Sequence, residues 1–298
     1  MSDNQQLDMP LLTVVTVCLN RADTIAAAIE SVLRQHAPDV EHLVIDGASS
    51  DGTLDVIARY PGVRVVSGAD KGLYDAMNKG ARLARGHYIV FLNSDDELAE
   101  GVVAAVRPHM HAGVDVVCVG TDFQRRRPDG GTEVIETLVA PEAIVLSPVT
   151  ATLGSPLLNA KFLSRAFLLE VVGQFDIRYR LAADVDLLLR AALANPQVAV
   201  LPIVGHHYME HAGSLTINPS DSNGRRAAEE CLAIANAKLA EPGVPRHIRA
   251  LMRALRGGKI LGISNIDRRA AGRPQSWWRA LGHSSDVGRF VWYLLRRP

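Results

Sequence analysis

The chain has 298 residues, of which 48% are hydrophobic and 21% are charged, and it contains 24 Gly and 15 Pro. This composition is that of an ordinary globular protein and excludes disordered, collagen-like and coiled-coil chains. The formal net charge is zero, but residues 225–298 carry 15 Lys and Arg against 5 Asp and Glu. An acidic body therefore precedes a basic C-terminal part, and we expect the two parts to have different partners.

The first 120 residues alternate between two apolar patterns. A continuous apolar run predicts a buried strand over residues 11–19, and further apolar stretches predict strands over residues 42–46, 63–67, 87–92 and 114–120. Helical spacing between these runs predicts helices that begin near Ile25, Thr53, Leu73 and Ala99. Asp23 or Thr24 is the expected cap of the first helix. Strands that alternate with helices of these lengths predict βαβ units and a mostly parallel sheet.

The pattern changes after residue 120. Residues 121–127 and 131–139 flank the turn Pro128-Asp129-Gly130-Gly131 and predict a β-hairpin. A helix over 180–195 and a strand over 198–202 are expected after a stretch of short helices and loops.

Beyond residue 222 the sequence predicts helices only, over residues 222–240, 245–261 and 276–296. We therefore expect two domains, an α/β domain over residues 1–221 and a helical, basic extension over residues 222–298.

The N-terminus and the cysteines indicate a cytoplasmic protein. MSDNQQLDMP has neither the basic nor the apolar region of a signal peptide, and no apolar run reaches the roughly 18 residues of a membrane span. The 3 cysteines are far apart in the sequence and form no C-x-x-C pair. Neither a disulfide framework nor a zinc cluster is expected from this spacing.

Polar residues follow the predicted strands at the carboxyl edge of the sheet, where ligands bind in such folds. Residues 46–51 follow the second strand, and Asn93-Ser94-Asp95-Asp96 follows the fourth. Adjacent carboxylates after a buried strand suit Mg²⁺ or Mn²⁺, which one or two carboxylates hold together with substrate phosphates. The alternative is that Ser94, Asp95 or Asp96 only caps the next helix.

Four stretches taken together resemble the family 2 glycosyltransferases, especially their bacterial polysaccharide-assembly members. They are TVVTVCLNRADTIAAAIESVLRQ, HLVIDGASSDGT, DKGLYDAMNKGARLARGHYIVFLNSDD and FDIRYRLAADVDLLLR, and they span roughly residues 11–215. Each stretch alone is weak, but four in order and at the right spacing are a specific match. The resemblance implies a GT-A fold, which is Rossmann-like, with a mixed, mostly parallel sheet flanked by helices. It also implies an inverting enzyme that uses nucleotide-diphosphate sugars.

The resemblance further implies a donor site at this edge. The end of the first strand would pass under the nucleotide base, commonly uracil, and Asp46 would accept a hydrogen bond from that base. Asn93 stands where the family usually has an aspartate that faces the ribose; an amide can still bond a hydroxyl, but one negative charge is lost. The expected donor-binding residues are Thr16, Cys18, Asn20, Asp46, Ser49, Asp51, Asp70, Lys71, Asn78, Asn93 and Ser94.

The resemblance also assigns the metal and the general base. Asp95 ends the Asp-x-Asp signature and would ligate Mn²⁺ or Mg²⁺, with Asp96 and His211 as further candidates. Asp184, in the stretch AADVD, matches the base that deprotonates the acceptor hydroxyl; Asp186 is offset by two residues and points elsewhere. The alternative for Asp184 is a first-turn carboxylate that complements the helix dipole.

The last segment interleaves Arg with Trp277, Trp278, Phe290, Trp292 and Tyr293. Such a tail suits an anionic membrane surface, and the alternative is that its aromatic side packs on the catalytic domain. No recognised nucleic-acid-binding fold accompanies the basic charge, so no nucleic-acid partner is expected.

These expectations combine into one function and two alternatives. We expect metal-dependent transfer of a sugar, with UDP-sugar as the expected donor, to a hydroxyl of a glycan or lipid-linked saccharide. The enzyme would be cytoplasmic and peripheral at the inner face of the plasma membrane. A sugar-1-phosphate nucleotidyltransferase would need a Gly-rich basic loop after the first strand, and CLNRADTI has no glycine. A non-catalytic nucleotide-sugar or glycan-binding module is the other alternative, which Asn93 leaves open.

Overall fold

The computed structural model describes residues 9–127, 131–139, 146, 161–210 and 221–270. Contacts divide the chain into two compact units. The first comprises Met1–Val145, Leu157–Ile177 and Ala194–Glu210, and the second comprises Leu146–Pro156, Arg178–Leu193 and His211–Pro298. The domain boundary expected after residue 221 remains a prediction.

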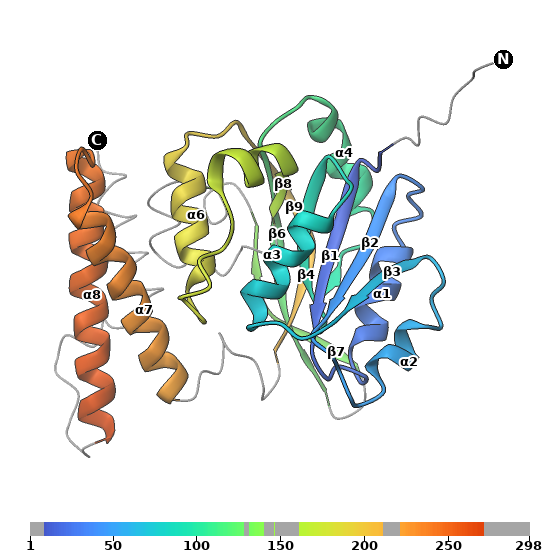
Figure 1. Cartoon of the computed structure of the whole chain (residues 1–298), viewed down its shortest axis with the longest axis horizontal. Helices are drawn as coiled ribbons and strands as arrows, with labels where there is room; N and C mark the ends of the chain where they lie inside the picture. The colour runs from blue at the N-terminus through green and yellow to red at the C-terminus, as the bar shows by residue number, and fades with distance from the viewer. Residues whose placement is uncertain (1–8, 128–130, 140–145, 147–160, 211–220, 271–298) are drawn as a thin grey trace. The chain divides into compact units, whose positions relative to one another are not determined.

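A mixed, mostly parallel sheet forms the first unit (Figure 1). Its strands are β1 (Leu12–Cys18), β2 (Val40–Asp46), β3 (Val63–Ser67), β4 (Tyr88–Asn93), β5 (Glu97–Leu98), β6 (Val116–Arg126), β7 (Thr132–Leu138), β8 (Lys161–Ser164) and β9 (Val198–Glu210). The order is β3-β2-β1-β4-β8-β6-β9-β5, with β7 paired to β6. Strands β3, β2, β1 and β4 are parallel, so their carboxyl ends meet at one edge.

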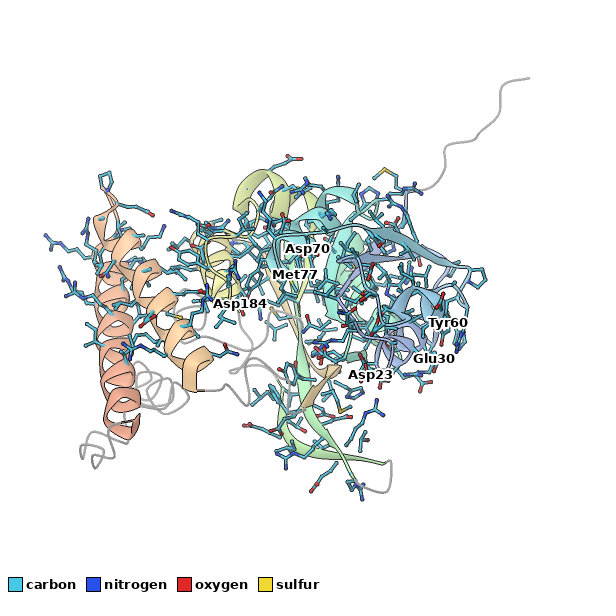
Figure 2. All side chains as sticks on the ribbon, turned by 60° about the horizontal axis from the view of Figure 1, so that its bottom comes forward. Asp23, Glu30, Tyr60, Asp70, Met77 and Asp184 are labelled. Atoms are coloured by element: carbon cyan, nitrogen blue, oxygen red, sulfur yellow. The ribbon has the colours of Figure 1, made fainter. Side chains whose placement is uncertain are left out.

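Helices cover both faces of this parallel part. On one face, α1 (Ile25–Leu33) and α2 (Thr53–Ile57) contribute apolar side chains to a cluster with Cys18 and Val44 of the sheet. Tyr60, after α2, donates a hydrogen bond of 2.8 Å to Glu30 of α1 (Figure 2). On the other face lies α3 (Leu73–Leu83), where a Cβ on Gly80 would overlap Val15. Only glycine allows so close an approach. Helix α4 (Val102–His111) and a π-helix (Phe167–Val172) complete the unit.

Three helices form the described part of the second unit. They are α6 (Ala183–Leu193), α7 (Asp221–Ala240) and α8 (Arg246–Ala270). Glu230 of α7 accepts hydrogen bonds from the backbone N–H groups of Leu181 and Ala182, which satisfies donors at the start of α6. Arg249 of α8 donates to carbonyls at the end of α7. Among the described helices, none has the length and apolar character needed to cross a membrane.

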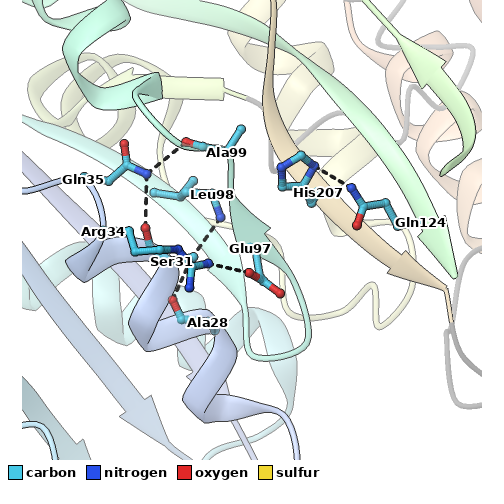
Figure 3. Close-up of polar contacts among 9 residues, drawn as sticks. All are labelled: Ala28, Ser31, Arg34, Gln35, Glu97, Leu98, Ala99, Gln124 and His207. Atoms are coloured by element: carbon cyan, nitrogen blue, oxygen red, sulfur yellow. Dashed lines mark hydrogen bonds and ion pairs between the residues drawn. The ribbon is translucent and has the colours of Figure 1, made fainter. Parts of the chain in front are cut away.

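The expected fold class is confirmed, and the expected strands and helices up to residue 93 agree with the structure to within two or three residues. The helix expected near Ala99 begins at Val102, because the short strand β5 lies between β4 and α4. Strand β5 pairs with β9 and is held to α1: Ser31 accepts from the Leu98 N–H and Gln35 donates to the Ala99 carbonyl (Figure 3). These partners are distant in sequence, so local apolar spacing could not predict them.

Other differences also come from long-range pairing. The strand expected over 114–120 continues into the hairpin as β6, and the strand expected over 198–202 extends to Glu210 because it pairs with β6 along its length. Strand β8 was not predicted, whereas the π-helix falls in the stretch where short helices and loops were expected. Thr24 occupies the cap position of α1, but its buried hydroxyl makes no hydrogen bond to any of the described residues. The helix expected over 276–296 lies outside the described residues.

Candidate active site

Hydrogen bonds join the loops that follow β1 and β2 at the carboxyl edge of the sheet. The backbone N–H of Asn20 donates to Ser49 Oγ at 2.8 Å, and the N–H of Ser50 donates to Asn20 Oδ1 at 2.9 Å. The N–H of Ala22 donates to Asp51 Oδ2 at 3.1 Å. Asn20 has a φ of 54°, a left-handed conformation that Asn adopts more readily than most residues. The two loops therefore form one connected wall, which contains three of the expected donor-binding residues.

Asp51 also bonds Thr53, the first residue of α2. Its Oδ1 accepts from the backbone N–H of Thr53 at 3.0 Å and from the Thr53 hydroxyl at 2.5 Å. Hydrogen bonds from the Thr53 side chain and then from the Ala22 backbone lower the pKa of Asp51 below its ordinary value. The carboxylate of Asp51 thus holds the wall together.

Asp46 lies at the end of β2 and has no exposed surface. Its oxygens accept from the N–H groups of Ala48 and Ser49, both at 3.1 Å, and from the Ser67 hydroxyl at 2.6 Å. Burial by itself raises the pKa of Asp46, but hydrogen bonds from Ser49 and Ser67 outweigh burial and hold this pKa below its ordinary value. This geometry gives Asp46 a role in holding the loop, and its expected contact with a base remains a prediction. Ser67 was not predicted as a site residue, although it ends β3 at the same edge.

Asp46→Ala is therefore expected to destabilise the fold. Three donors lose their buried acceptor, and we expect the free energy of unfolding to fall by about 2–4 kcal/mol. Urea denaturation measures this change, with the exposed Asp55→Ala of α2 as the control, for which a change within about 0.5 kcal/mol is expected. Because the folded-state pKa is lowered, the contribution of Asp46 is complete above the ordinary aspartate pKa of about 3.9 and is lost as pH falls through the lower folded value. An Asp46→Ala variant that is as stable as the wild type but no longer binds the nucleotide would instead support a direct contact between Asp46 and the base.

Thr16 and Cys18, expected at the donor, lie in the core beneath the site. The Thr16 hydroxyl is buried and lies 2.9 Å from Nε2 of His42. Burial lowers the pKa of His42 to about 4, so this imidazole is neutral. Burial and the Asp46 carboxylate raise the pKa of the Cys18 thiol to about 12. The side chains of Thr16 and Cys18 thus pack under the loops as uncharged groups.

Asp70, labelled in Figure 2, and Lys71 precede α3 in the chain. Asp70 Oδ2 lies 2.9 Å from the place where a Cβ on Gly47 would stand, so Asp70 is beside the loop after β2. Its Oδ1 accepts from the N–H of Gly72 at 2.8 Å. The Lys71 side chain is exposed. The structure therefore brings Asp70 to the wall formed by the β1 and β2 loops.

Asn78 has a structural role in the first unit, and its expected donor contact remains a prediction. It is buried in α3, its Nδ2 donates to the Phe175 carbonyl at 2.9 Å, and its Oδ1 accepts from the Phe175 N–H at 2.8 Å. Both ends of the amide are thus committed to one residue that lies 97 positions away in the chain. The side chain attaches the segment around Phe175 to the sheet.

The four residues after β4 alternate between exposed and buried positions. Asn93 and Asp95 are partly exposed, whereas Ser94 and Asp96 are buried. The alternative in which this segment caps a helix is wrong, because β5 follows it and Gly101, with a φ of 75°, precedes α4. Asp95 is therefore the carboxylate of this loop that reaches the surface.

The donor set at this loop fits a divalent metal that is shared with a phosphate ligand. No group of three or more His, Cys, Asp or Glu side chains in the described part of the chain could hold a metal alone. One carboxylate plus substrate phosphates is the usual arrangement for Mg²⁺, and Asp95 can supply that carboxylate. Asp96 is a poor ligand, since both its oxygens accept protein N–H groups. His211 lies outside the described residues.

Asp184 belongs to the second unit, whereas the residues of the β1, β2 and β4 loops belong to the first. It is the second residue of α6 and is partly buried, and its Oδ1 lies 2.8 Å from the Val185 N–H. Asp186 forms an ion pair of 2.8 Å with Arg190 on the same helix. The two carboxylates therefore have different surroundings, and the general-base assignment of Asp184 remains a prediction.

Comparison with known proteins identifies the family. A sequence profile described as "Glycosyl transferase family 2" matches residues 13–148. The PGL/p-HBAD biosynthesis glycosyltransferase of Mycobacterium bovis is 29% identical over 68% of this chain and 78% of its own length. An uncharacterized glycosyltransferase of Mycobacterium tuberculosis is 30% identical over 64% of this chain and 72% of its own length.

Two solved structures show the same fold. The structure of S. aureus TarS 1-349 in complex with UDP-GlcNAc has a TM-score of 0.65 at 16% identity, covering 94% of this chain and 80% of its own. The mannosyltransferase PcManGT of Pyrobaculum calidifontis, in complex with GDP-Man and Mn²⁺, has a TM-score of 0.59 at 18% identity, covering 97% and 82%. These likenesses confirm the GT-A fold. With the profile and the relatives they lead to one conclusion, that the chain belongs to glycosyl transferase family 2.

Proposed function

We propose that this glycosyltransferase is an inverting, metal-dependent enzyme that transfers a sugar from a nucleotide-diphosphate sugar, with a UDP-sugar as the expected donor. The observation that carries the proposal is the partial exposure of Asn93 and Asp95 at the carboxyl edge of the sheet. The connected loops that follow β1 and β2 lie at the same edge. TarS with UDP-GlcNAc and PcManGT with GDP-Man and Mn²⁺ have the same fold and bind the class of donor that we propose. Membership of a glycosyltransferase family argues against the two alternatives, a nucleotidyltransferase and a non-catalytic binding module.

Each group of residues has a distinct task in this proposal. The wall formed by Asn20, Ser49 and Asp51 borders the nucleotide, and Asp70 stands beside it. Asn93 contacts the ribose, and Asp95 holds the divalent metal, Mn²⁺ or Mg²⁺. When bound, such a metal offsets the negative charge of the diphosphate.

The proposed chemistry is a single displacement with Asp184 as general base. Its carboxylate takes the proton of the acceptor hydroxyl, and the hydroxyl oxygen forms a bond to the anomeric carbon. The bond from that carbon to the nucleoside diphosphate breaks, and the diphosphate leaves with the electron pair. Attack from the face opposite the leaving group inverts the anomeric configuration. We propose a glycan or a lipid-linked saccharide as the acceptor.

A thermal-shift panel tests the donor assignment. UDP-sugars and GDP-sugars are added with Mn²⁺ and again with EDTA, and the melting temperature is recorded. A donor at 100 times its Kd stabilises the folded state by about 2.7 kcal/mol, so the matching donor should raise the melting temperature only when metal is present. Equal melting temperatures with every nucleotide sugar and metal would contradict the proposal.

The charges of α7 and α8 support a second proposal, that the C-terminal part binds an anionic membrane surface at the inner face of the plasma membrane. In α7 the cations have partners: Arg225 pairs with Glu229 at 2.8 Å and Arg226 with Glu230 at 3.1 Å. In α8, Arg253 and Arg256 are exposed, and they have no carboxylate partner in the described part of the chain. Unpaired arginines on a helix attract anionic headgroups. The aromatic segment 276–298, expected to take part, lies outside the described residues.

Replacing Arg253 and Arg256 by Gln tests this surface. Each cation near an anionic membrane contributes about 1 kcal/mol, so we expect about 30-fold weaker binding to phosphatidylserine vesicles in a sedimentation assay. The matched control is Arg59→Gln with Arg126→Gln, which removes the same charge from exposed positions of the first unit. Deleting residues 276–298 should also release the protein from vesicles. Equal loss of binding in the control and the α8 variant would show a general charge effect and contradict the proposal.

A further inference from the structure

The buried carboxylate of Asp96 connects the loop after β4 to β9. Its Oδ1 accepts from the backbone N–H of Met209 at 3.0 Å, and its Oδ2 accepts from Asn93 Nδ2 at 2.9 Å. Nε2 of His206 lies 3.4 Å from the same Oδ2. Asp96 and His206 are each only 1% exposed, so water does not compete for these contacts. The side chain of Asn93 is therefore held from inside the protein.

These contacts decide which end of the Asn93 amide faces outward. A carboxylate can only accept hydrogen bonds, so the group that Asn93 turns toward Asp96 must be its NH₂. The carbonyl oxygen, Oδ1, is then directed away from Asp96. In the part of the chain that the structure describes, Oδ1 of Asn93 has no hydrogen-bond partner, and the residue is partly exposed.

We infer that Asp96 is a positioning residue, which makes Asn93 present a hydrogen-bond acceptor to a ribose hydroxyl of the donor. The inference rests on the proposed donor function. An aspartate at position 93 would present the same acceptor without help, because both of its oxygens accept. In this chain the carboxylate stands instead at position 96, buried behind the amide, and the outward-facing group keeps its hydrogen-bonding character.

Asp96→Asn should reverse the Asn93 amide. The Met209 N–H still needs an acceptor, so the new amide turns its oxygen toward Met209 and its NH₂ toward Asn93. Two NH₂ groups cannot bond each other, and Asn93 must rotate so that its Oδ1 accepts from residue 96. The NH₂ of Asn93 then faces the donor, and an acceptor has become a donor at the surface.

Exchanging the two residues should restore the original surface. In the double variant Asn93→Asp with Asp96→Asn, the carboxylate at 93 accepts from the amide at 96 and presents its second oxygen outward. The amide oxygen at 96 still accepts from the Met209 N–H. The single variant Asn93→Asp, by contrast, places two carboxylates within hydrogen-bond distance, where they repel each other.

The test is calorimetric binding of UDP and GDP, each with its 2′-deoxy and 3′-deoxy analogues, to the full chain in the presence of Mn²⁺. The wild type should bind the matching nucleotide about tenfold more tightly than one of its deoxy analogues. Asp96→Asn should lose this preference and bind the parent nucleotide about tenfold more weakly. The exchanged double variant should recover both the affinity and the preference. A role of Asp96 in stability alone would weaken parent and deoxy nucleotides equally and leave the preference intact.

Three results would overturn the inference: an Asp96→Asn variant with the wild-type preference, a folded double variant without it, or an Asn93→Ala variant that retains it. The last variant leaves Asp96 in place and keeps the test valid if Asp96→Asn does not fold. Failure of the wild type to bind any of the nucleotides would instead contradict the proposed function, on which the inference depends.

Discussion

Replacing Asp184 by Asn is expected to reduce turnover by about 10²–10⁴-fold, the usual contribution of a general base. The amide retains the size of the carboxylate but cannot take the proton of the acceptor hydroxyl. Nucleotide and metal are assigned to residues of the first unit, so the Kd of the donor should stay close to that of the wild type. Steady-state turnover and calorimetric donor binding, measured on the same preparation, separate these two effects.

Asp186→Asn is the matched control for this experiment. It lies two positions further along α6 and removes a carboxylate of the same kind, which pairs with Arg190 at 2.8 Å. A partly exposed i,i+4 ion pair contributes only about 0.3–0.5 kcal/mol, so turnover should change little. Near-normal turnover in Asp184→Asn together with a large loss in Asp186→Asn would transfer the general-base role to Asp186.

Asp95→Ala is expected to abolish both transfer and metal-dependent donor binding. The carboxylate is the proposed protein ligand of the metal, and a metal bound at a reacting phosphate contributes several kcal/mol, so activity should fall by about 10³-fold or more. Calorimetric titration of UDP with and without Mn²⁺ measures the binding effect. In the variant the two titrations should coincide.

Glu97→Gln provides the control for Asp95→Ala. Glu97 follows in the same segment, and its carboxylate pairs at 2.7 Å with Arg34, the residue after α1 (Figure 3). Exposed ion pairs of this kind contribute about 0–1 kcal/mol, so the Mn²⁺ dependence of UDP binding should persist. If Asp95→Ala keeps the wild-type Mn²⁺ dependence as well, the metal assignment is incorrect.

Local sequence was sufficient to predict the parallel part of the sheet. Strands β1 and β4 are buried on both faces, so their sequences are largely apolar. The helices between them have apolar residues at helical spacing on the side that faces the sheet. For the same reason, the sequence placed residues 46–51 and 93–96 correctly at the carboxyl ends of their strands.

The roles of individual site residues depended on partners that are distant in the chain. Asn78 is bonded to Phe175, 97 residues away, and Asp96 is bonded to Met209, 113 residues away. Neither contact leaves a periodic pattern in the sequence. In the sequence alone, Asp95 and Asp96 are equivalent neighbouring carboxylates. Only the pairing of β5 with β9 shows which of the two is buried. The hydrogen bond that Asp46 accepts from Ser67 also comes from another strand, and the sequence did not predict it.

The most direct test of the proposed mechanism is the anomeric configuration of the product. The full chain is incubated with the nucleotide sugar selected by the thermal-shift panel, a saccharide acceptor and Mn²⁺, and the new linkage is examined by proton NMR. The proposed single displacement predicts a product with inverted configuration, formed with Mn²⁺ and absent after EDTA treatment. A product with retained configuration, or transfer at the same rate in EDTA, would contradict it.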